Sequence, residues 1–210
     1  MKNVLIIGAG GFGREVFAWC RADPGYGKTW QIRGFLDDNP NALDGFTVHA
    51  RIVGKVSDYQ AAPDEECICA IGHPGTKKRI VELLLARGAV FRSLIHPSVV
   101  MGSMVTLGQG VVLCPGVVLT SHLVVGDFVM FNCLSSAGHD VQVGRFATIS
   151  GHCDLTGFVE VGEGVFMGSR ASIIPGRKIG AGATVGAGSV VITNVAPATT
   201  VFGNPARRIS

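Results

Sequence analysis

The sequence has no apolar run long enough to cross a bilayer, because glycine, proline or a charged residue interrupts every such run before about 18 residues. We expect no cleavable leader, since Met-Lys-Asn-Val leads directly into an apolar segment that we expect to be a strand. Charged residues make up 16% of the chain and the net charge is +3, too little for a surface that binds nucleic acid or anionic membranes. We therefore expect a cytoplasmic protein whose partners are small anions, with no nucleic acid and no membrane among them.

The six cysteines are dispersed and form no Cys-x-x-Cys pair, so the sequence suggests neither a zinc knuckle nor a disulfide framework. We expect most of them to be buried as small apolar residues. With 210 residues, of which 47% are hydrophobic, the chain can form one large or two small domains with substantial cores.

The most regular feature is a period of six: without an insertion, every sixth residue from Met101 to Val191 is apolar. This period fits neither an α-helix nor a simple strand alternation, and it is typical of hexapeptide β-helices. Three hexapeptides form one triangular coil of a left-handed parallel β-helix, so residues three hexapeptides apart stack, and about five coils result. We expect the apolar residues to fill the prism. The glycine that often follows them, as at Gly126 and Gly144, is expected to turn its corners.

Residues 1–95 show a different pattern, in which strands and helices alternate. Apolar runs predict strands at Val4–Ile7, Ile32–Leu36, Cys67–Ile71 and Val90–Leu94, with helices after the first and the third. This order predicts a Rossmann-like α/β domain with a parallel sheet, whose ligands bind at the carboxyl ends of the strands. The pattern changes at His96-Pro97, so a second, all-β domain is expected at residues 96–210.

A glycine-rich turn, Gly8-x-Gly10-x-x-Gly13, lies between the first predicted strand and the first predicted helix. Such a turn lets a diphosphate approach the backbone closely, while the helix N-terminus supplies N–H donors. A domain of this size is short of the roughly 150 residues of a dinucleotide fold, which favours a nucleotide-sugar diphosphate over NAD or FAD. A purely structural glycine turn remains the alternative.

Charged side chains near the same strand ends are candidates for nucleotide binding. Asp37 or Asp38 could accept hydrogen bonds from a uracil or a ribose. Lys77 and Lys78, in the helix that follows Gly72, could meet phosphate oxygens or simply form an ordinary solvated helix face.

In the repeat region, His139 lies two places after the inward Ala137 and is expected to project outward from the prism. A histidine in this setting can act as a general base. Stacking by three hexapeptides places Gly157 beside it, where a glycine leaves its backbone N–H accessible to a carbonyl, as an oxyanion site requires. From spacing alone, an ordinary exposed histidine is the simpler interpretation.

Six segments of the chain, taken in order, carry a family resemblance. They are the glycine-rich turn, Leu36-Asp37-Asp38, Ile71-Gly72, Ile95-His96-Pro97-Ser98, Gly138-His139-Asp140 and Gly203-Asn204-Pro205-Ala206. Together they resemble the bacterial sugar acyltransferases typified by the sialic acid O-acetyltransferase and by the nucleotide-sugar N-acetyltransferases that make bacillosamine and perosamine. The resemblance covers nearly the whole chain.

The resemblance implies roles for particular residues. It implies that His139 is the catalytic base and that the acidic residue after it, Asp140, assists. The acceptor nucleotide is implied to lie in the N-terminal domain, at Gly8, Gly10, Gly11, Asp37, Gly72, His73 and Lys77. Acetyl-coenzyme A is implied to lie along the β-helix between neighbouring subunits of a homotrimer, near Asn132, Gly157, Ser169 and Ala187.

Some hexapeptide β-helix proteins are zinc carbonic anhydrases that carry a His-x4-His pair and a third histidine. No such pair exists in this chain, so we expect no metal. Two positions depart from the amino-sugar N-acetyltransferases: Thr148 stands where they usually carry a second histidine, and Gly138 where they often have an acidic residue.

We therefore expect an enzyme that moves the acetyl group of acetyl-coenzyme A to the amino group of a nucleotide-linked amino sugar, with His139 as general base. Direct transfer is expected, because no cysteine or serine has a sequence context that demands an acyl-enzyme. The alternative within the same chemistry is O-acetylation of sialic acid or another sugar hydroxyl. The alternative outside enzymes is a non-catalytic nucleotide-binding scaffold.

Overall fold

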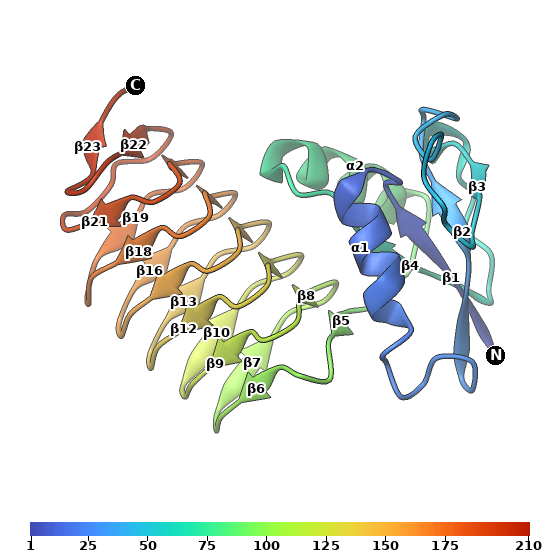
Figure 1. Cartoon of the computed structure of the whole chain (residues 1–210), viewed down its shortest axis with the longest axis horizontal. Coiled ribbons are helices and arrows are strands. Elements are labelled where there is room, and N and C mark those ends of the chain that lie inside the picture. The colour runs from blue at the N-terminus through green and yellow to red at the C-terminus, as the bar shows by residue number, and fades with distance from the viewer. The chain divides into compact units, whose positions relative to one another are not determined.

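The computed structural model describes residues 1–210, which form two compact units, Met1–Leu94 and Ile95–Ser210 (Figure 1). The first unit combines a parallel sheet with two helices, and the second is a parallel β-helix. The predicted fold class, an α/β domain followed by an all-β domain of hexapeptide repeats, is confirmed.

The first unit contains β1 (Lys2–Ile7), α1 (Gly11–Cys20), β2 (Trp30–Leu36), β3 (Ile52–Gly54), a short 3₁₀ helix (Val56–Asp58), β4 (Glu65–Cys69) and α2 (Pro74–Ala86). The four strands are parallel and lie in the order β3-β2-β1-β4. In the central strand β1, Val4–Ile7 are buried, as expected for a parallel strand covered on both faces. Neither helix has the length and the apolar composition needed to cross a membrane.

Two elements of this unit differ from the expectation. The sequence pattern does not reveal β3, because three residues are too few to show a period. The strand expected at Val90–Leu94 is not formed as such: Phe91 makes a single bridge to Cys67, and the pairing stops there. The next strand, β5 (Leu94–Ile95), spans the boundary between the two units.

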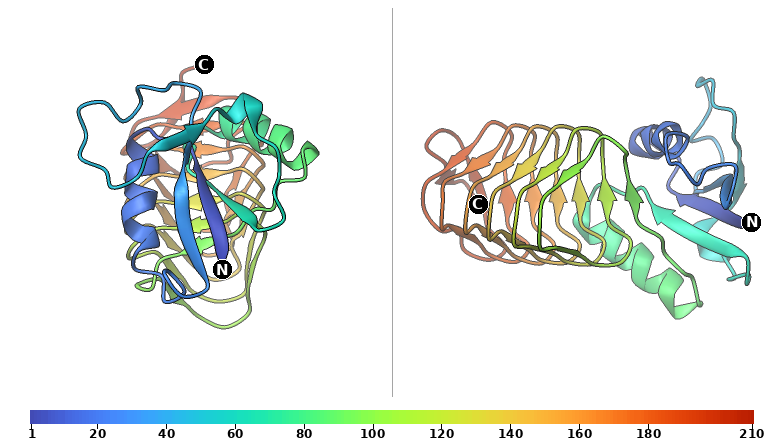
Figure 2. Two further views of the ribbon diagram at one scale, coloured as in Figure 1. Left: turned by 90° about the vertical axis from the view of Figure 1, so that its right-hand side faces the viewer. Right: turned by 90° about the horizontal axis from the view of Figure 1, so that it is seen from below.

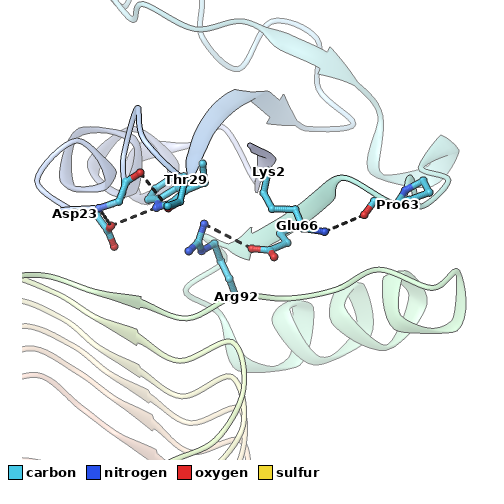
Figure 3. A network of polar contacts seen from close by, with 8 residues as sticks. Lys2, Asp23, Thr29, Pro63, Glu66 and Arg92 are labelled. Carbon is cyan, nitrogen blue, oxygen red and sulfur yellow. Dashed lines mark hydrogen bonds and ion pairs between the residues drawn. The ribbon is translucent and has the colours of Figure 1, made fainter.

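Polar contacts secure the sheet near the amino end of β1 (Figure 3). The Lys2 ammonium donates to the carbonyl oxygen of Pro63 at 2.9 Å, and the Arg92 guanidinium lies 3.6 Å from the Glu66 carboxylate. The same guanidinium lies 4.4 Å from the ring centre of Trp30. The glycine-rich turn follows the opposite, carboxyl end of β1. We therefore assign these contacts to the stability of the sheet rather than to ligand binding.

The β-helix consists of short strands that coil through three sheets (Figure 2). Sheet I contains β6 (Val100–Met101), β9 (Val118–Leu119), β12 (Ser136–Ala137), β15 (Asp154–Leu155), β18 (Ser172–Ile173) and β21 (Val190–Val191). Sheet II contains β7 (Val105–Leu107), β10 (Leu123–Val125), β13 (Gln142–Val143), β16 (Glu160–Val161) and β19 (Lys178–Ile179). Sheet III includes β8 (Val112–Leu113), β11 (Met130–Phe131), β14 (Thr148–Ile149), β17 (Phe166–Met167), β20 (Thr184–Val185), β22 (Thr200–Phe202) and the antiparallel β23 (Arg207–Arg208).

The register of the sheets follows the predicted stacking, since Ala137 pairs with Leu155 and Val143 with Val161 in parallel. The apolar residue of nearly every hexapeptide is buried in one continuous core. The two exceptions lie at the start of the β-helix, where no earlier coil covers them: Met101 is exposed and Leu107 is only partly buried.

The glycines that follow the core residues do not turn the corners, which corrects the expectation. The left-handed residue of each corner lies two places later, and it is often not glycine, as at Phe128 and Phe146. Gly126 and Gly144 are needed for a different reason: a Cβ atom there would lie 2.7 and 2.6 Å from backbone nitrogens of the next coil. These glycines therefore allow the coils to approach closely.

Candidate active site

His139 and Asp140 form a hydrogen-bonded pair at the corner between β12 and β13. Asp140 adopts the left-handed conformation with φ of +61°, which aspartate tolerates better than most residues. Neighbours on a straight strand point to opposite faces, but this corner brings the two side chains together, with Nδ1 of His139 2.8 Å from Oδ2 of Asp140. The side chains are 57% and 43% exposed, so the pair lies on the outer surface of the prism, as predicted for His139.

The carboxylate fixes the chemistry of the imidazole. A neutral imidazole that donates its Nδ1 hydrogen to Asp140 carries its lone pair on Nε2. No group of the chain forms a hydrogen bond with Nε2, so this nitrogen is free to accept a proton from a ligand. The arrangement is that of a general base oriented by an acid.

Gly157 lies against the imidazole from the next coil, as the stacking predicts. A Cβ atom on Gly157 would stand 2.6 Å from both Cε1 and Nε2 of His139, so any residue other than glycine at this position would clash with the imidazole. Its carbonyl accepts a hydrogen bond from the Gly176 N–H at 3.0 Å, whereas its own N–H has no acceptor within the chain. A free N–H next to a free Nε2 can serve as an oxyanion donor beside a base.

The residues implied for acetyl-coenzyme A occupy two edges of the prism. Gly157 lies on the edge between sheets I and II, whereas Asn132, Ser169 and Ala187 lie on the edge between sheets III and I. Ser169 and Ala187 are stacked, since the Gly188 N–H donates to the Ser169 carbonyl at 2.9 Å. The Asn132 side chain accepts from the Cys133 N–H at 2.7 Å. Sheet I separates the two edges.

In the first unit, the glycine-rich turn follows β1 and leads into α1. Gly8 has φ of +98°, and a Cβ atom on Gly13 would collide with the Gly8 carbonyl, so both positions need glycine. Gly10 and Gly11, in contrast, have open space around them, where a Cβ atom would meet nothing closer than 4.0 Å. The turn therefore exposes backbone at the N-terminus of α1, an arrangement that binds anions.

Asp37 holds this turn in place. Its Oδ2 accepts from the Ala9 N–H at 2.7 Å, and its Oδ1 accepts from the Asn39 N–H at 2.9 Å. Asp38 is engaged in the same way, since its Oδ1 accepts from the Ser57 N–H at 3.1 Å. Both carboxylates thus accept hydrogen bonds from backbone N–H groups, and those of Asp37 fix the conformation of the glycine-rich turn.

The segment after β4 reaches the same edge of the sheet, because β4 and β2 both neighbour β1 in parallel. Gly72 and His73 precede α2, and His73 caps this helix by accepting the Thr76 N–H on Nδ1 at 3.3 Å. Lys77 is placed differently from a solvated lysine, because it is only 2% exposed. Burial lowers the pKa of Lys77 from 10.5 to about 8, an effect that the neighbouring Cys69 opposes.

Sequence reasoning missed two features. One is a cavity of about 460 Å³ beside α1, whose lining includes Arg14, Arg21, Phe46 and His49, with the Arg14 guanidinium 3.5 Å from the Phe46 ring centre. No motif marks these residues. The other is Phe158, whose ring centre lies 4.9 Å from that of His139. Phe158 follows Asp140 by three hexapeptides and therefore stacks on it in the next coil. The stacking rule could have found it.

Within residues 1–210, no group of three His, Cys, Asp or Glu side chains is placed to hold a metal ion. All cysteines are free thiols, and all except Cys133 are buried.

Comparison with protein families gives two matches. Residues 3–84 match the PglD N-terminal domain, and residues 159–193 match the hexapeptide repeat of succinyl-transferase. The GDP-perosamine N-acetyltransferase of Escherichia coli O157:H7 is 30% identical over 97% of this chain and 95% of its own length.

Solved structures agree with this result. The acetyltransferase domain of PglB from Neisseria gonorrhoeae has a TM-score of 0.89 and 29% identity, with full coverage of both chains. PerB from Caulobacter crescentus, solved in complex with CoA and GDP-perosamine, has a TM-score of 0.87 and 28% identity, covering 100% of this chain and 98% of its own. These matches confirm the resemblance read from the sequence. The chain belongs to the family of nucleotide-amino-sugar N-acetyltransferases built on hexapeptide repeats.

Proposed function

We propose that this protein transfers the acetyl group of acetyl-coenzyme A to the amino group of a nucleotide-linked amino sugar, with His139 as the general base. The observation that carries the proposal is the arrangement of the imidazole, with Nδ1 bound to Asp140 at 2.8 Å and Nε2 free above Gly157. The complex of PerB with CoA and GDP-perosamine supports the choice of donor and acceptor class.

In the proposed step, the sugar nitrogen attacks the thioester carbonyl as Nε2 of His139 accepts a proton from that nitrogen. The Gly157 N–H stabilises the oxyanion. When the tetrahedral intermediate collapses, the C–S bond breaks and the thiolate of coenzyme A takes the proton back from His139. A positioned base typically contributes about 10² to 10⁴ in rate, and one oxyanion donor about 2.7 to 4 kcal/mol. Asp140 keeps the imidazole in the required tautomer.

The acceptor nucleotide is proposed to bind at the glycine-rich turn. Gly10 and Gly11 leave the backbone open to a diphosphate, and the N-terminus of α1 supplies N–H donors there. Asp37 contributes by holding the turn through the Ala9 N–H. The buried Lys77 is a weaker candidate than the sequence suggested, because a lysine that is 2% exposed cannot reach a phosphate without moving. The cytoplasm, which supplies both substrates, is the expected location.

The active form is proposed to be a homotrimer. In a single chain the His139 side chain is 57% exposed, and a second surface that covers it would exclude water and strengthen the hydrogen bonds of the reaction. A cyclic trimer supplies this surface three times by the same contact. An active monomer, shown by light scattering together with activity across dilution, would argue against this part of the proposal.

The test is a thiol-release assay with acetyl-coenzyme A and a panel of GDP-, UDP- and dTDP-amino sugars, together with free sialic acid. We expect one nucleotide amino sugar of the panel to cause thiol release from acetyl-coenzyme A, and no release in its absence. His139→Ala should lower kcat at least about a hundredfold. His122→Ala, a control at an exposed histidine one coil earlier on the same edge, should retain activity.

Each alternative has its own result. Release with sialic acid and with no amino sugar would favour O-acetylation. No release with any acceptor would favour a non-catalytic scaffold. Near-normal turnover by His139→Ala would remove this residue from the chemistry.

A further inference from the structure

Phe158 occupies a position for which its contribution to stability gives no reason. It follows Gly157 at the corner between β15 and β16, with a left-handed φ of +63°. Other corners of this β-helix carry bulky residues in the same conformation, as at Phe128 and Phe146, but those two rings are buried and stack on each other. Phe158 is 58% exposed instead, so little of its apolar surface gains from burial.

Phe158 makes two contacts with the same residue of the previous coil. Its N–H donates to the His139 carbonyl at 2.9 Å. Its ring lies 4.9 Å from the imidazole, centre to centre, at an interplanar angle of 87°. Such an edge-to-face arrangement is one of the two favoured geometries for a pair of aromatic rings.

These contacts meet the imidazole from three directions, while more than half of the side chain stays exposed. Asp140 binds Nδ1, Gly157 lies under the Cε1 and Nε2 atoms, and the Phe158 ring stands perpendicular to the imidazole. An exposed histidine without such neighbours can occupy several staggered rotamers. A base that samples other rotamers is absent from the reacting geometry for part of the time, which lowers the rate.

We propose that Phe158 is a positioning residue that holds the His139 imidazole in the orientation in which Nε2 faces the substrate nitrogen. This inference rests on the proposed role of His139 as the base. It assigns to Phe158 an effect on kcat rather than on the binding of either substrate.

The experiment compares Phe158→Ala, Phe158→Leu and Phe158→Tyr in the full chain, with Met104→Ala as the matched control. Met104 is an exposed apolar residue in the same left-handed conformation on the same edge of the prism, three coils earlier. For each variant, kcat and both KM values are measured. The chemical shift of the His139 Cε1 proton is followed by NMR, with assignment by His139→Ala.

We expect Phe158→Ala to lower kcat about three- to tenfold, the range that corresponds to one aromatic pair contact, with both KM values within about twofold of wild type. The His139 Cε1 proton should lose the ring-current displacement that Phe158 imposes. Phe158→Tyr should restore both kcat and the shift, whereas Phe158→Leu should restore neither. Met104→Ala should match wild type.

Several results would overturn the inference. They are an unchanged kcat in Phe158→Ala, a loss confined to the KM for acetyl-coenzyme A, an unchanged Cε1 shift, or full activity in Phe158→Leu. If Phe158→Ala does not fold, Phe158→Leu decides, since it keeps the size of the side chain without the ring. Failure of the proposed function is distinguishable, because it appears as full activity in His139→Ala or as a wild-type protein without transfer, while the NMR shift still reports on the contact.

Discussion

The Cε1 and Nε2 atoms of His139 occupy the space into which a side chain on Gly157 would project, since a Cβ atom there would lie 2.6 Å from both. The two residues belong to successive coils and meet only because the coils stack in register. The proposed base and the proposed oxyanion donor are therefore two parts of one steric arrangement.

Gly157→Ala should displace the imidazole and lower kcat by about a hundredfold, the scale of losing a positioned base or an oxyanion donor. The backbone should tolerate alanine, because Gly157 is not among the glycines with positive φ. Gly151→Ala is the matched control, at the equivalent place of the preceding corner, where a Cβ atom would meet only the Cys133 carbonyl at 3.3 Å. Because Gly151 shares its edge of the prism with Ser169, which is implied for acetyl-coenzyme A, kcat is compared at saturating acetyl-coenzyme A, and equal kcat values would contradict the steric argument.

Asp140→Asn should lower kcat about tenfold and leave both KM values nearly unchanged. An amide in place of the carboxylate can present its NH2 group to Nδ1, which favours the tautomer whose Nε2 is protonated and cannot accept a proton. Asparagine tolerates the left-handed conformation at this position, with φ of +61°, as well as aspartate does. Circular dichroism and steady-state kinetics test this, and a variant with wild-type kcat would show that Asp140 is not needed to orient His139.

Asp37→Asn should raise the KM for the nucleotide sugar about tenfold while the KM for acetyl-coenzyme A stays the same. The carboxylate now accepts N–H groups from Ala9 at 2.7 Å and Asn39 at 2.9 Å, and an amide can replace only one of these acceptors. The glycine-rich turn should loosen as a result. Asp44→Asn, at an exposed loop residue, is the control, and equal KM values in the two variants would separate Asp37 from the acceptor site.

The buried Lys77 predicts a specific dependence of stability on pH. Its pKa is lowered by burial from 10.5 to about 8 in the folded protein. Between these values the unfolded chain binds more protons than the folded one, so the unfolding free energy rises with pH in this window. The total change is on the order of 3 kcal/mol.

Lys77→Met should therefore be more stable than wild type at pH 7, and this advantage should shrink as the pH approaches 10. Urea unfolding at pH 7, 8.5 and 9.5 measures the difference, and the same comparison in a Cys69→Ala background removes the thiol that interacts with Lys77. Lys78→Met, one residue along the same helix, should show no such dependence. If the unfolding free energies of wild type and Lys77→Met changed with pH in parallel, the pKa of Lys77 would be the same in the folded and the unfolded chain, which would contradict the prediction.

Local pattern was sufficient for much of the fold. The continuous apolar run of Val4–Ile7 predicted a strand of a parallel sheet, and β1 contains it. The six-residue period predicted the register in which Ala137 pairs with Leu155. The pattern failed where few residues carry the signal, as in the three-residue β3, and where burial depends on distant neighbours, as at Lys77.

The sequence by itself determined the β-helix, because a six-residue period can bury its apolar residues only by coiling. It also placed Gly157 next to His139, since stacking follows from counting. Only the tertiary structure decided that the Asp140 carboxylate turns toward Nδ1 and that the Phe158 ring stands against the imidazole. Both depend on left-handed corners and on side-chain directions, which the spacing of residues along a chain does not specify.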